Sequence, residues 1–171
     1  MKPDEVDDIL EAWRVELPDL PREPLEIAKR IARLSGVLDA AAADELQLLG
    51  LTRAEYDVLA TLRRSGPPFR MRPGTLTSSL LLSSGGTSNV IRRLAEAGYV
   101  ARHAAEQDGR GALVELTDEG VRIAEKAVRA ATGAQAAVLG RIPAAVRGDL
   151  VQVLRTSLDA IRGEAPRRSV R

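Results

Sequence analysis

Apolar residues recur every three or four positions along most of this chain, the spacing that places them on one face of an α-helix. The pattern predicts a short amphipathic helix over residues 4–16 and a long helix from residue 25 to about residue 49. Three prolines between residues 18 and 24 predict an extended linker. The long helix carries one apolar stripe, formed by Ile27, Ile31, Leu34, Leu38, Ala42 and Leu46. A single stripe on so long a helix is typical of a scaffold at a dimer interface.

The segment that follows begins with two short helices. Thr52 and Glu55 have the spacing of a capping box, so they predict a helix over residues 53–64. The turn sequence SGPPF ends this helix, and residues 69–72 are expected to form a short strand after it. Pro73 then suits the first turn of a second helix.

A third helix and a hairpin complete this segment. The sequence SSGGTSNVIRRLAEAGYV predicts an amphipathic helix with a small, polar first turn, which Gly98 ends. Two β-like runs, 100–104 and 112–116, flank the polar tip EQDGRG and predict a hairpin with Arg110 at its tip. This order is typical of a winged helix-turn-helix, whose third helix fits the major groove of double-stranded DNA.

Two helices are expected after the hairpin. Thr117 caps the first, which runs to about Leu139, and Pro143 begins the second. The second has a dense apolar face, formed by Val146, Leu150, Val153, Leu154, Leu158 and Ile161. Together with the N-terminal stripe, this face is more apolar surface than one small lobe can bury. We therefore expect a homodimer through the terminal helices.

The predicted fold is mainly α with a small β-wing, that is, a winged helix-turn-helix plus a helical dimerisation region. The first part of the chain, with its extra Trp-bearing helix, and the last helices are assigned to dimerisation. The predicted parts are N-terminal helices (1–50), a DNA-binding lobe (51–117), C-terminal helices (118–163) and a disordered basic tail (164–171).

Composition narrows the function classes. The chain has 171 residues with no cysteine and one histidine, which excludes disulfides and thiolate metal sites and argues against a His-rich metal site. The sequence contains no nucleophile–base pair and no phosphate-cradling loop, so we expect no enzyme activity, cofactor or metal. No run reaches the ~18–20 apolar residues of a membrane span. The acidic N-terminus lacks a signal-peptide pattern, so a cytoplasmic protein without membrane contact is expected.

The distribution of charge is more informative than its sum, which is only +1. Acidic residues concentrate within residues 4–11. By contrast, Arg92, Arg93, Arg102 and Arg110 lie in the predicted reading module. A local basic face on a nearly neutral protein is enough to bind phosphates.

Candidate DNA contacts lie on the third helix and at the hairpin tip. Asn89 and Arg92 have hydrogen-bonding groups that can read base edges, while Arg110 can enter a minor groove or hold the backbone. The full set of predicted contacts is Ser84, Gly85, Thr87, Ser88, Asn89, Arg92, Arg93 and Arg110. The alternative for Arg92 and Arg93 is that they are solvated charges on an ordinary surface helix.

The run from LTRAEYDVLATLRRSG to ALVELTDEG resembles the MarR family of dimeric bacterial regulators, and the resemblance extends over about residues 25–162. The tip QDGRG is similar to the family's D-x-R wing signature, and LTDEG is similar to its L-T-x-x-G exit. The resemblance implies a homodimer that reads a pseudo-palindromic operator. It also implies that Asp108 orients the wing residue Arg110.

Within that family the chain is most similar to the urate-responsive (PecS/HucR-like) branch, whose extra N-terminal helix carries a Trp, matched here by EAWRVELPDL. The resemblance implies a ligand site built from Trp13, Asp57 and Arg102. A second Arg of that site falls at Val90 in a gap-free alignment, and its loss removes a charge-assisted bond of roughly 1.5–3 kcal/mol. We therefore expect urate to act weakly and Val90→Arg to improve the response.

Each residue of this implied ligand site also has a structural alternative. Trp13 lies on an apolar stripe and can be a core anchor, because a Trp ring buries a large apolar area. Asp57 can form a structural ion pair. The single His103, beside the wing, can titrate near neutral pH or can be a structural or solvated residue.

The function expected from the sequence is a ligand-responsive, dimeric transcriptional repressor, released from double-stranded DNA by a small anionic or aromatic effector. The alternative is a small-molecule-binding or protein-interaction module of the same fold that lacks sequence-specific DNA binding. Arg72, where the branch often has a capping Thr, favours the alternative. The retained wing arginine favours DNA binding.

Overall fold

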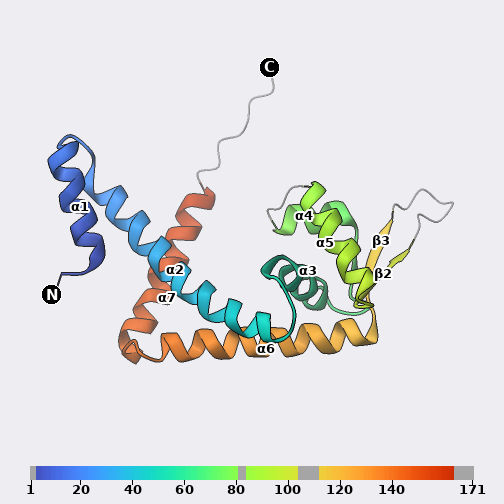
Figure 1. The fold of residues 1–171 in the computed structure, drawn as a ribbon. Helices are drawn as coiled ribbons and strands as arrows, with labels where there is room; N and C mark the ends of the chain where they lie inside the picture. Colours follow the sequence, from blue (N-terminus) through green and yellow to red (C-terminus); the bar gives the residue numbers. More distant parts are fainter. Residues whose placement is uncertain (1–2, 81–83, 104–111, 164–171) are drawn as a thin grey trace, which may run out of the picture. The chain divides into compact units, whose positions relative to one another are not determined.

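The computed structural model describes residues 3–80, 84–103 and 112–163, and it is mainly helical with one small antiparallel sheet (Figure 1). The predicted fold class is therefore confirmed. The predicted basic tail and the hairpin tip with Asp108 and Arg110 lie outside the described residues. In chain order the elements are α1 (Glu5–Glu16), α2 (Arg22–Leu48), α3 (Arg53–Arg64), β1 (Arg70–Met71), α4 (Pro73–Leu80), α5 (Ser84–Glu96), β2 (Val100–His103), β3 (Leu113–Leu116), α6 (Asp118–Leu139) and α7 (Ala144–Gly163).

The chain divides into two compact units, Met1–Gln135 and Ala136–Arg171. The first contains the N-terminal helices, the three-helix lobe, the sheet and most of α6, while the second contains the end of α6 and α7. Among the helices of the described residues, none combines the length and apolar character that a bilayer span requires.

α1 packs on α2 through buried apolar residues and an ion pair. Asp4 caps the first turn of α1 by accepting hydrogen bonds from the backbone N–H groups of Val6 and Asp7, at 2.9 and 3.2 Å. Val6 and Leu10 are buried. Arg30 of α2 lies 2.9 Å from the Asp7 carboxylate. The short helix is therefore fixed to the long one at its N-terminal end.

α2 begins at Arg22, earlier than the predicted residue 25. The physical reason is the position of Pro24, which falls in the first turn of the helix, where no backbone N–H is needed for an intrahelical bond. The linker between α1 and α2 is therefore shorter than the linker predicted from the three prolines.

The core of the lobe is built from residues of α2 through α6 and includes one face of α5. The predicted capping box is present, because the Thr52 N–H donates to Glu55 Oε2 at 2.8 Å and the Glu55 N–H donates to Thr52 Oγ1 at 3.3 Å. The largest fully buried apolar side chains are Leu46, Val58, Leu59, Leu62, Leu76, Leu94 and Val114. Because they form one cluster, a shift of α5 would disturb packing throughout the lobe.

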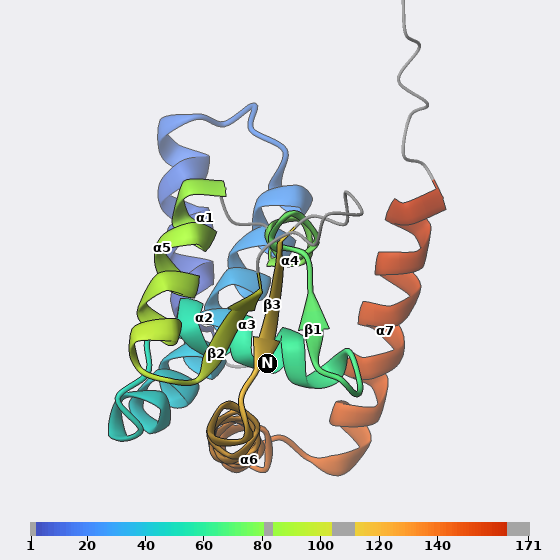
Figure 2. The ribbon, with the colours of Figure 1, turned by 90° about the vertical axis from the view of Figure 1, so that its right-hand side faces the viewer.

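The three strands form one antiparallel sheet in the order β1-β3-β2, with β3 in the middle (Figure 2). In this register Met71 lies opposite Val114, and Val100 lies opposite Leu116. β2 and β3 are the two arms of the predicted hairpin. β1 is limited to Arg70 and Met71, so the predicted strand at residues 69–72 is confirmed in a shorter form.

The start of α6 lies directly against the backbone of Tyr99. The Thr117 hydroxyl donates to the Gly98 carbonyl at 2.7 Å and accepts from the Gly120 N–H at 3.0 Å. A Cβ added to Gly120 would lie 1.9 Å from the Tyr99 carbonyl oxygen, so only glycine fits here. This contact sets where the long helix leaves the lobe.

We expect Gly120→Ala to destabilise the protein by about 1–3 kcal/mol, because the methyl group overlaps backbone that cannot rotate away. Urea unfolding followed by circular dichroism measures the effect. Gly133→Ala is the matched control on the same helix, since nothing lies within 4 Å of a Cβ there. That control should gain up to about 1 kcal/mol from helix propensity. Equal stability of the two variants would contradict the close packing at Tyr99.

Candidate nucleic-acid interface

α5 has one face in the core and the opposite face in solvent, as the sequence pattern predicted. Val90, Ile91 and Leu94 are buried, at 9%, 3% and 1% exposed. Along the other side, the exposed residues include Gly85, Ser88, Asn89, Arg92 and Arg93. A helix anchored by three apolar side chains can present its polar face as a rigid surface.

The first turn of α5 is open, but one of its predicted contact residues is not accessible. Nothing lies within 4 Å of a Cβ added to Gly85, so another chain could approach the backbone closely there. Thr87 is only 1% exposed. Its burial does not fit a contact with phosphate, and its polar group is partnered within the protein. The side chain of Ser84 lies outside what the structure describes.

The two arginines of α5 differ in how firmly they are held. Arg92 pairs with Glu96 one turn away on the same helix, at 2.8 Å, and both side chains are more than half exposed. Such a pair is weak and exchanges readily for another anion. Arg93 instead pairs at 3.0 Å with Glu55 of α3, whose side chain is 7% exposed. Arg93 therefore fixes α5 against α3, while Arg92 remains available to a ligand.

The two strands of the hairpin are joined by one contact between polar side chains. His103 Nε2 of β2 lies 3.2 Å from Glu115 Oε2 of β3. Arg102 is exposed on β2, opposite Val114. The predicted contact residue Arg110 and its predicted partner Asp108 lie outside the described residues.

Two cavities contain residues of the implied ligand site, and neither of them contains all three residues. Trp13, 42% exposed, lines a cavity of about 220 Å³ with Leu17 and Leu20 at the junction of α1 and α2. Asp57 lines a second cavity of about 310 Å³ between α3 and α4. Arg102 lines neither of these two. Asp57 also forms an ion pair with Arg53 at 3.1 Å, as expected if its role is structural and not ligand binding.

Val90 is a core residue and does not line either of these cavities. An arginine at this position would place a charge among Val58, Leu59 and other apolar side chains, which costs several kcal/mol unless the group finds a partner. The expectation that Val90→Arg improves a urate response therefore does not fit the structure. Sequence alignment alone could not show this, because it gives position along the chain but not burial.

Arg53 links the long N-terminal helix to the lobe. Its guanidinium donates to Asp39 of α2 at 2.7 Å and to Asp57 of α3 at 3.1 Å. The hydrogen bond from Arg53 lowers the pKa of Asp39 below its ordinary value, and a bond from Ser35 adds to this. These contacts attach α2 to the first helix of the lobe, α3.

The Asp39 pair should therefore stabilise the fold at neutral pH and not in acid. A carboxylate whose pKa is lower in the folded state contributes stability above its unfolded pKa, near 3.9, and loses it as pH falls through the folded pKa. Because Asp39 is half exposed, we expect Asp39→Asn to cost less than about 1 kcal/mol at pH 7, and to cost less at pH 3 than at pH 7. Urea unfolding at both pH values, with Asp44→Asn of the same helix as control, checks this. An equal cost at both pH values would contradict it.

Comparison with known proteins agrees with this geometry. Residues 49–111 match a family profile described as the MarR family. The HTH-type transcriptional regulator PecS of Dickeya dadantii is 35% identical over 124 residues, which cover 72% of this chain and 75% of PecS. An HTH-type transcriptional repressor of Mycobacterium bovis is 31% identical over 126 residues, 71% of this chain and 86% of that protein.

Solved structures share the fold. Apo MarR from E. coli superposes with a TM-score of 0.67 at 24% identity, covering 77% of this chain and 96% of MarR. The MarR family protein Rv2887 of Mycobacterium tuberculosis, in a complex with DNA, has a TM-score of 0.63 at 25% identity and covers 81% and 98%. The resemblance predicted from the wing and exit motifs is confirmed, and the similarity to PecS supports the predicted branch. The chain belongs to the MarR family of winged-helix transcriptional regulators, which are not enzymes.

Proposed function

We propose that this protein is a dimeric transcriptional repressor that reads a pseudo-palindromic operator with α5. The observation that carries the proposal is the exposed polar face of α5, which includes Ser88, Asn89 and Arg92. The opposite face of the helix is buried in the core. The DNA complex of the related Rv2887 supports DNA as the partner. A rigid polar helix of this kind is what major-groove reading requires.

The residues of the proposed interface have different tasks. Asn89 can pair with adenine and Arg92 with guanine, once Arg92 exchanges Glu96 for a base edge. Ser88 and the open backbone at Gly85 contact phosphates and set the register of the helix. Arg93 does not contact DNA in this proposal. Its ion pair with Glu55 of α3 holds α5 in a fixed orientation. The wing residues Asp108 and Arg110 remain a prediction from the sequence.

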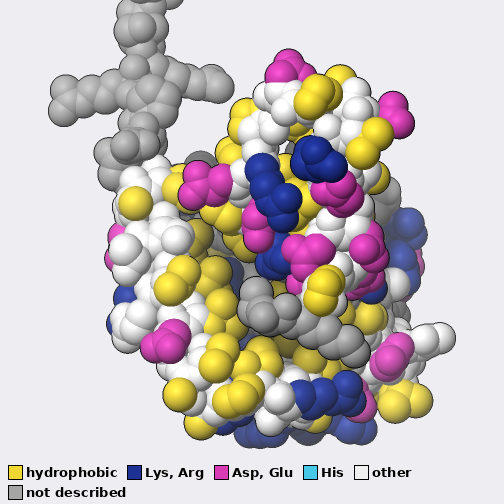
Figure 3. Space-filling view, turned by 90° about the vertical axis from the view of Figure 1, so that its left-hand side faces the viewer, with side chains coloured by type: hydrophobic (Ala, Val, Ile, Leu, Met, Phe, Trp, Pro, Cys, Tyr) yellow, Lys and Arg dark blue, Asp and Glu magenta, His cyan; other side chains and the backbone are white. Residues whose placement is uncertain are grey.

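Dimerisation is proposed from the apolar side chains that the chain leaves exposed. On α2 the stripe is buried only at its C-terminal end, and Ile27 and Ile31 are each 53% exposed. Figure 3 shows hydrophobic side chains on the surfaces of both the N-terminal helices and α7. On α7 the exposed set is Val146, Val151, Val153, Leu154, Leu158 and Ile161. A second copy of the chain would remove this surface from water.

The proposed effector is a small anionic or aromatic molecule that releases the operator. It would act by changing the distance between the two α5 helices, which must match one turn of DNA, about 34–36 Å. The cavity beside Trp13 supplies an aromatic wall, and the cavity beside Asp57 supplies polar groups. Urate is expected to be a weak effector, because the core residue Val90 supplies no cation to either of them.

Selection of bound duplexes from a random pool tests the proposed function. The purified protein is expected to enrich an inverted repeat whose half-site centres lie about 10 base pairs apart, since each protomer reads one major groove. Sequencing of the retained duplexes identifies the operator. Retention of duplexes with no common sequence would reject sequence reading and favour the alternative of a MarR-fold module without an operator.

A further inference from the structure

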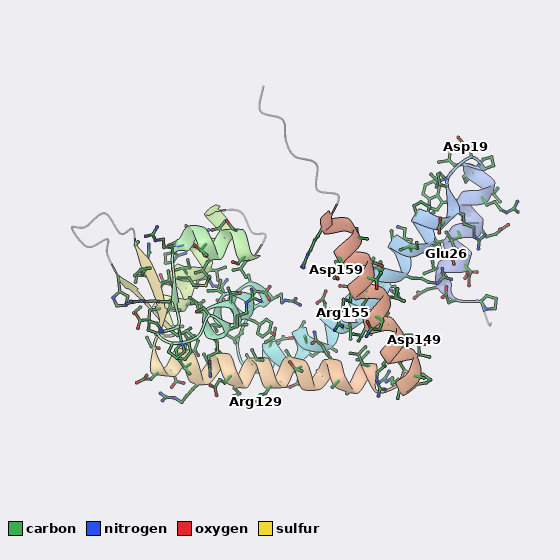
Figure 4. All side chains as sticks on the ribbon, turned by 180° about the vertical axis from the view of Figure 1, so that it is seen from behind. Asp19, Glu26, Arg129, Asp149, Arg155 and Asp159 are labelled. Atoms are coloured by element: carbon green, nitrogen blue, oxygen red, sulfur yellow. The ribbon has the colours of Figure 1, made fainter. Side chains whose placement is uncertain are left out.

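Glu55 of α3 is a charged residue buried within the lobe. The other charged side chains of the described ranges lie at least partly in solvent, as Arg129 of α6 does, with 76% of its side chain exposed (Figure 4). Glu55 is only 5% exposed, and among the buried residues of the described ranges it is the one that carries a charge. Removing a carboxylate from water costs free energy unless its oxygens find partners. The partners of Glu55 therefore indicate what its burial achieves.

The two oxygens of this carboxylate bind two different elements. Oε2 accepts hydrogen bonds from the backbone N–H and from the hydroxyl of Thr52, at 2.8 and 2.7 Å, and so completes the capping box of α3. Oε1 lies 3.0 Å from Nη2 of Arg93 on α5. One buried group therefore fixes the start of α3 and, at the same time, attaches α5 to it.

The turn that holds Glu55 is itself attached to α2. Arg53, two residues earlier, donates a hydrogen bond to Asp39 of α2 at 2.7 Å. Charged contacts thus run from α2 to the first turn of α3, and from this turn to α5. Because α2 is part of the proposed dimer interface, this route relates the direction of α5 to the interface as well as to the lobe.

Arg93 lies where it can control the rotation of α5 about its own axis. Burial of apolar surface is non-directional, so Ile91 and Leu94 hold α5 in the core without closely specifying its rotation. A charge-assisted hydrogen bond, by contrast, has a defined geometry. Arg93 follows Asn89 by four residues, so the two residues lie on the same side of the helix. An anchor at Arg93 therefore sets the direction of Asn89.

We propose that Glu55 is a positioning residue for operator reading, which touches no DNA but fixes the direction of the polar face of α5 through Arg93. The inference rests on the proposed function, because operator reading is the property that Glu55 would adjust. The competing role for Arg93 is direct contact with a phosphate, as the sequence predicts. In that role, loss of the Glu55 charge would release Arg93 and strengthen binding to duplexes of any sequence.

Two substitutions separate the ion pair from the helix cap. Glu55→Gln removes the charge that holds Arg93 but keeps the cap, because glutamine also completes a capping box. Arg93→Gln removes the same pair from its exposed side and leaves the cap untouched. Glu119→Gln is the matched control, since Glu119 forms an exposed ion pair with Arg122 on α6.

Amide hydrogen exchange of the protein without DNA is the first measurement. Backbone amides of α5 should exchange at least about twofold faster in Glu55→Gln and in Arg93→Gln, the minimum expected for the loss of one coupled pair. Amides of α3 should keep their parental rates, because its cap is retained. The double variant should exchange no faster than the single variants, since all three lack the same pair. Parental exchange of α5 in both single variants would overturn the proposal.

Operator discrimination is the second measurement, taken as the ratio of dissociation constants for a scrambled duplex and for the selected inverted repeat. This ratio should fall about tenfold in both variants, with an unchanged salt dependence, and should stay parental in Glu119→Gln. Parental discrimination in both variants would overturn the proposal. So would equal weakening on both duplexes in Arg93→Gln, with a shallower salt dependence and no loss in Glu55→Gln, which would assign Arg93 to a phosphate. A parent protein that prefers no operator would instead reject the proposed function, and the exchange rates alone would then decide whether Glu55 holds α5.

Discussion

Replacing both Asn89 and Arg92 with alanine should remove most of the protein's preference for its operator while leaving the fold intact. Both side chains are exposed, and neither contributes to the core cluster. Each lost base pairing costs about 1–3 kcal/mol, and a dimer presents the face twice, so the preference should fall by about 10³-fold or more. Dissociation constants for the operator and a scrambled duplex at one salt concentration measure the loss.

The control for this variant is Arg122→Ala, which removes an exposed arginine of α6 away from the reading face. It should bind the operator and the scrambled duplex as the parent does. The double variant should keep the parent's unfolding midpoint, because the pair of Arg92 with Glu96 is exposed and weak. Unchanged discrimination by the folded double variant would show that another surface reads DNA.

Introducing Asp at Leu154 and Leu158 of α7 should convert the dimer to a monomer and abolish tight operator binding. Leu154 and Leu158 are 39% and 54% exposed in the single chain, so neither substitution opens a cavity in the lobe core. In a dimer, each Asp would bury an unpaired charge, which is among the largest penalties available to a single substitution. We expect the dimer dissociation constant to rise at least about 100-fold.

Sedimentation velocity over a range of protein concentrations measures this change. Arg155→Gln on the same helix is the polar control and should remain dimeric. A monomeric variant with parental circular dichroism would also lose operator affinity, because one protomer reads only one half-site. A variant that stays dimeric at nanomolar concentration would place the interface away from the apolar face of α7.

Helices that are specified by capping residues and apolar spacing could be predicted from the sequence. The burial of individual polar residues, which depends on packing between elements, could not. The capping box of Thr52 and Glu55 and the apolar spacing of α3 specify that helix to the residue. The burial of Thr87 was not predictable, because a small polar residue in a first turn suits either side of a helix. The proline at position 24 looked like a linker residue, yet it is compatible with a first helical turn.

The candidate sites show the same limit more strongly. The polar face of α5 follows from helical periodicity, so it could be predicted. Grouping Trp13, Asp57 and Arg102 required knowledge of which elements meet, and this grouping stays a prediction. Trp13 and Asp57 line two different cavities, and Arg102 lines neither of them. Conversely, Arg63 and Glu125 are 62 residues apart, and no local pattern indicates that they form a hydrogen bond. Exposed charges on helices are predictable, but their pairing across helices depends on packing.

Operator reading by α5 is tested by a ratio of two dissociation constants measured at one salt concentration. One is for the selected inverted repeat, and the other is for a scrambled duplex of the same length and composition. Sequence-specific reading by a dimer predicts a ratio of about 10³ or more, with two protomers bound per repeat. Removal of one half-site should abolish most of this preference. A ratio near one, with binding that depends only on salt, would contradict the claim that α5 reads an operator.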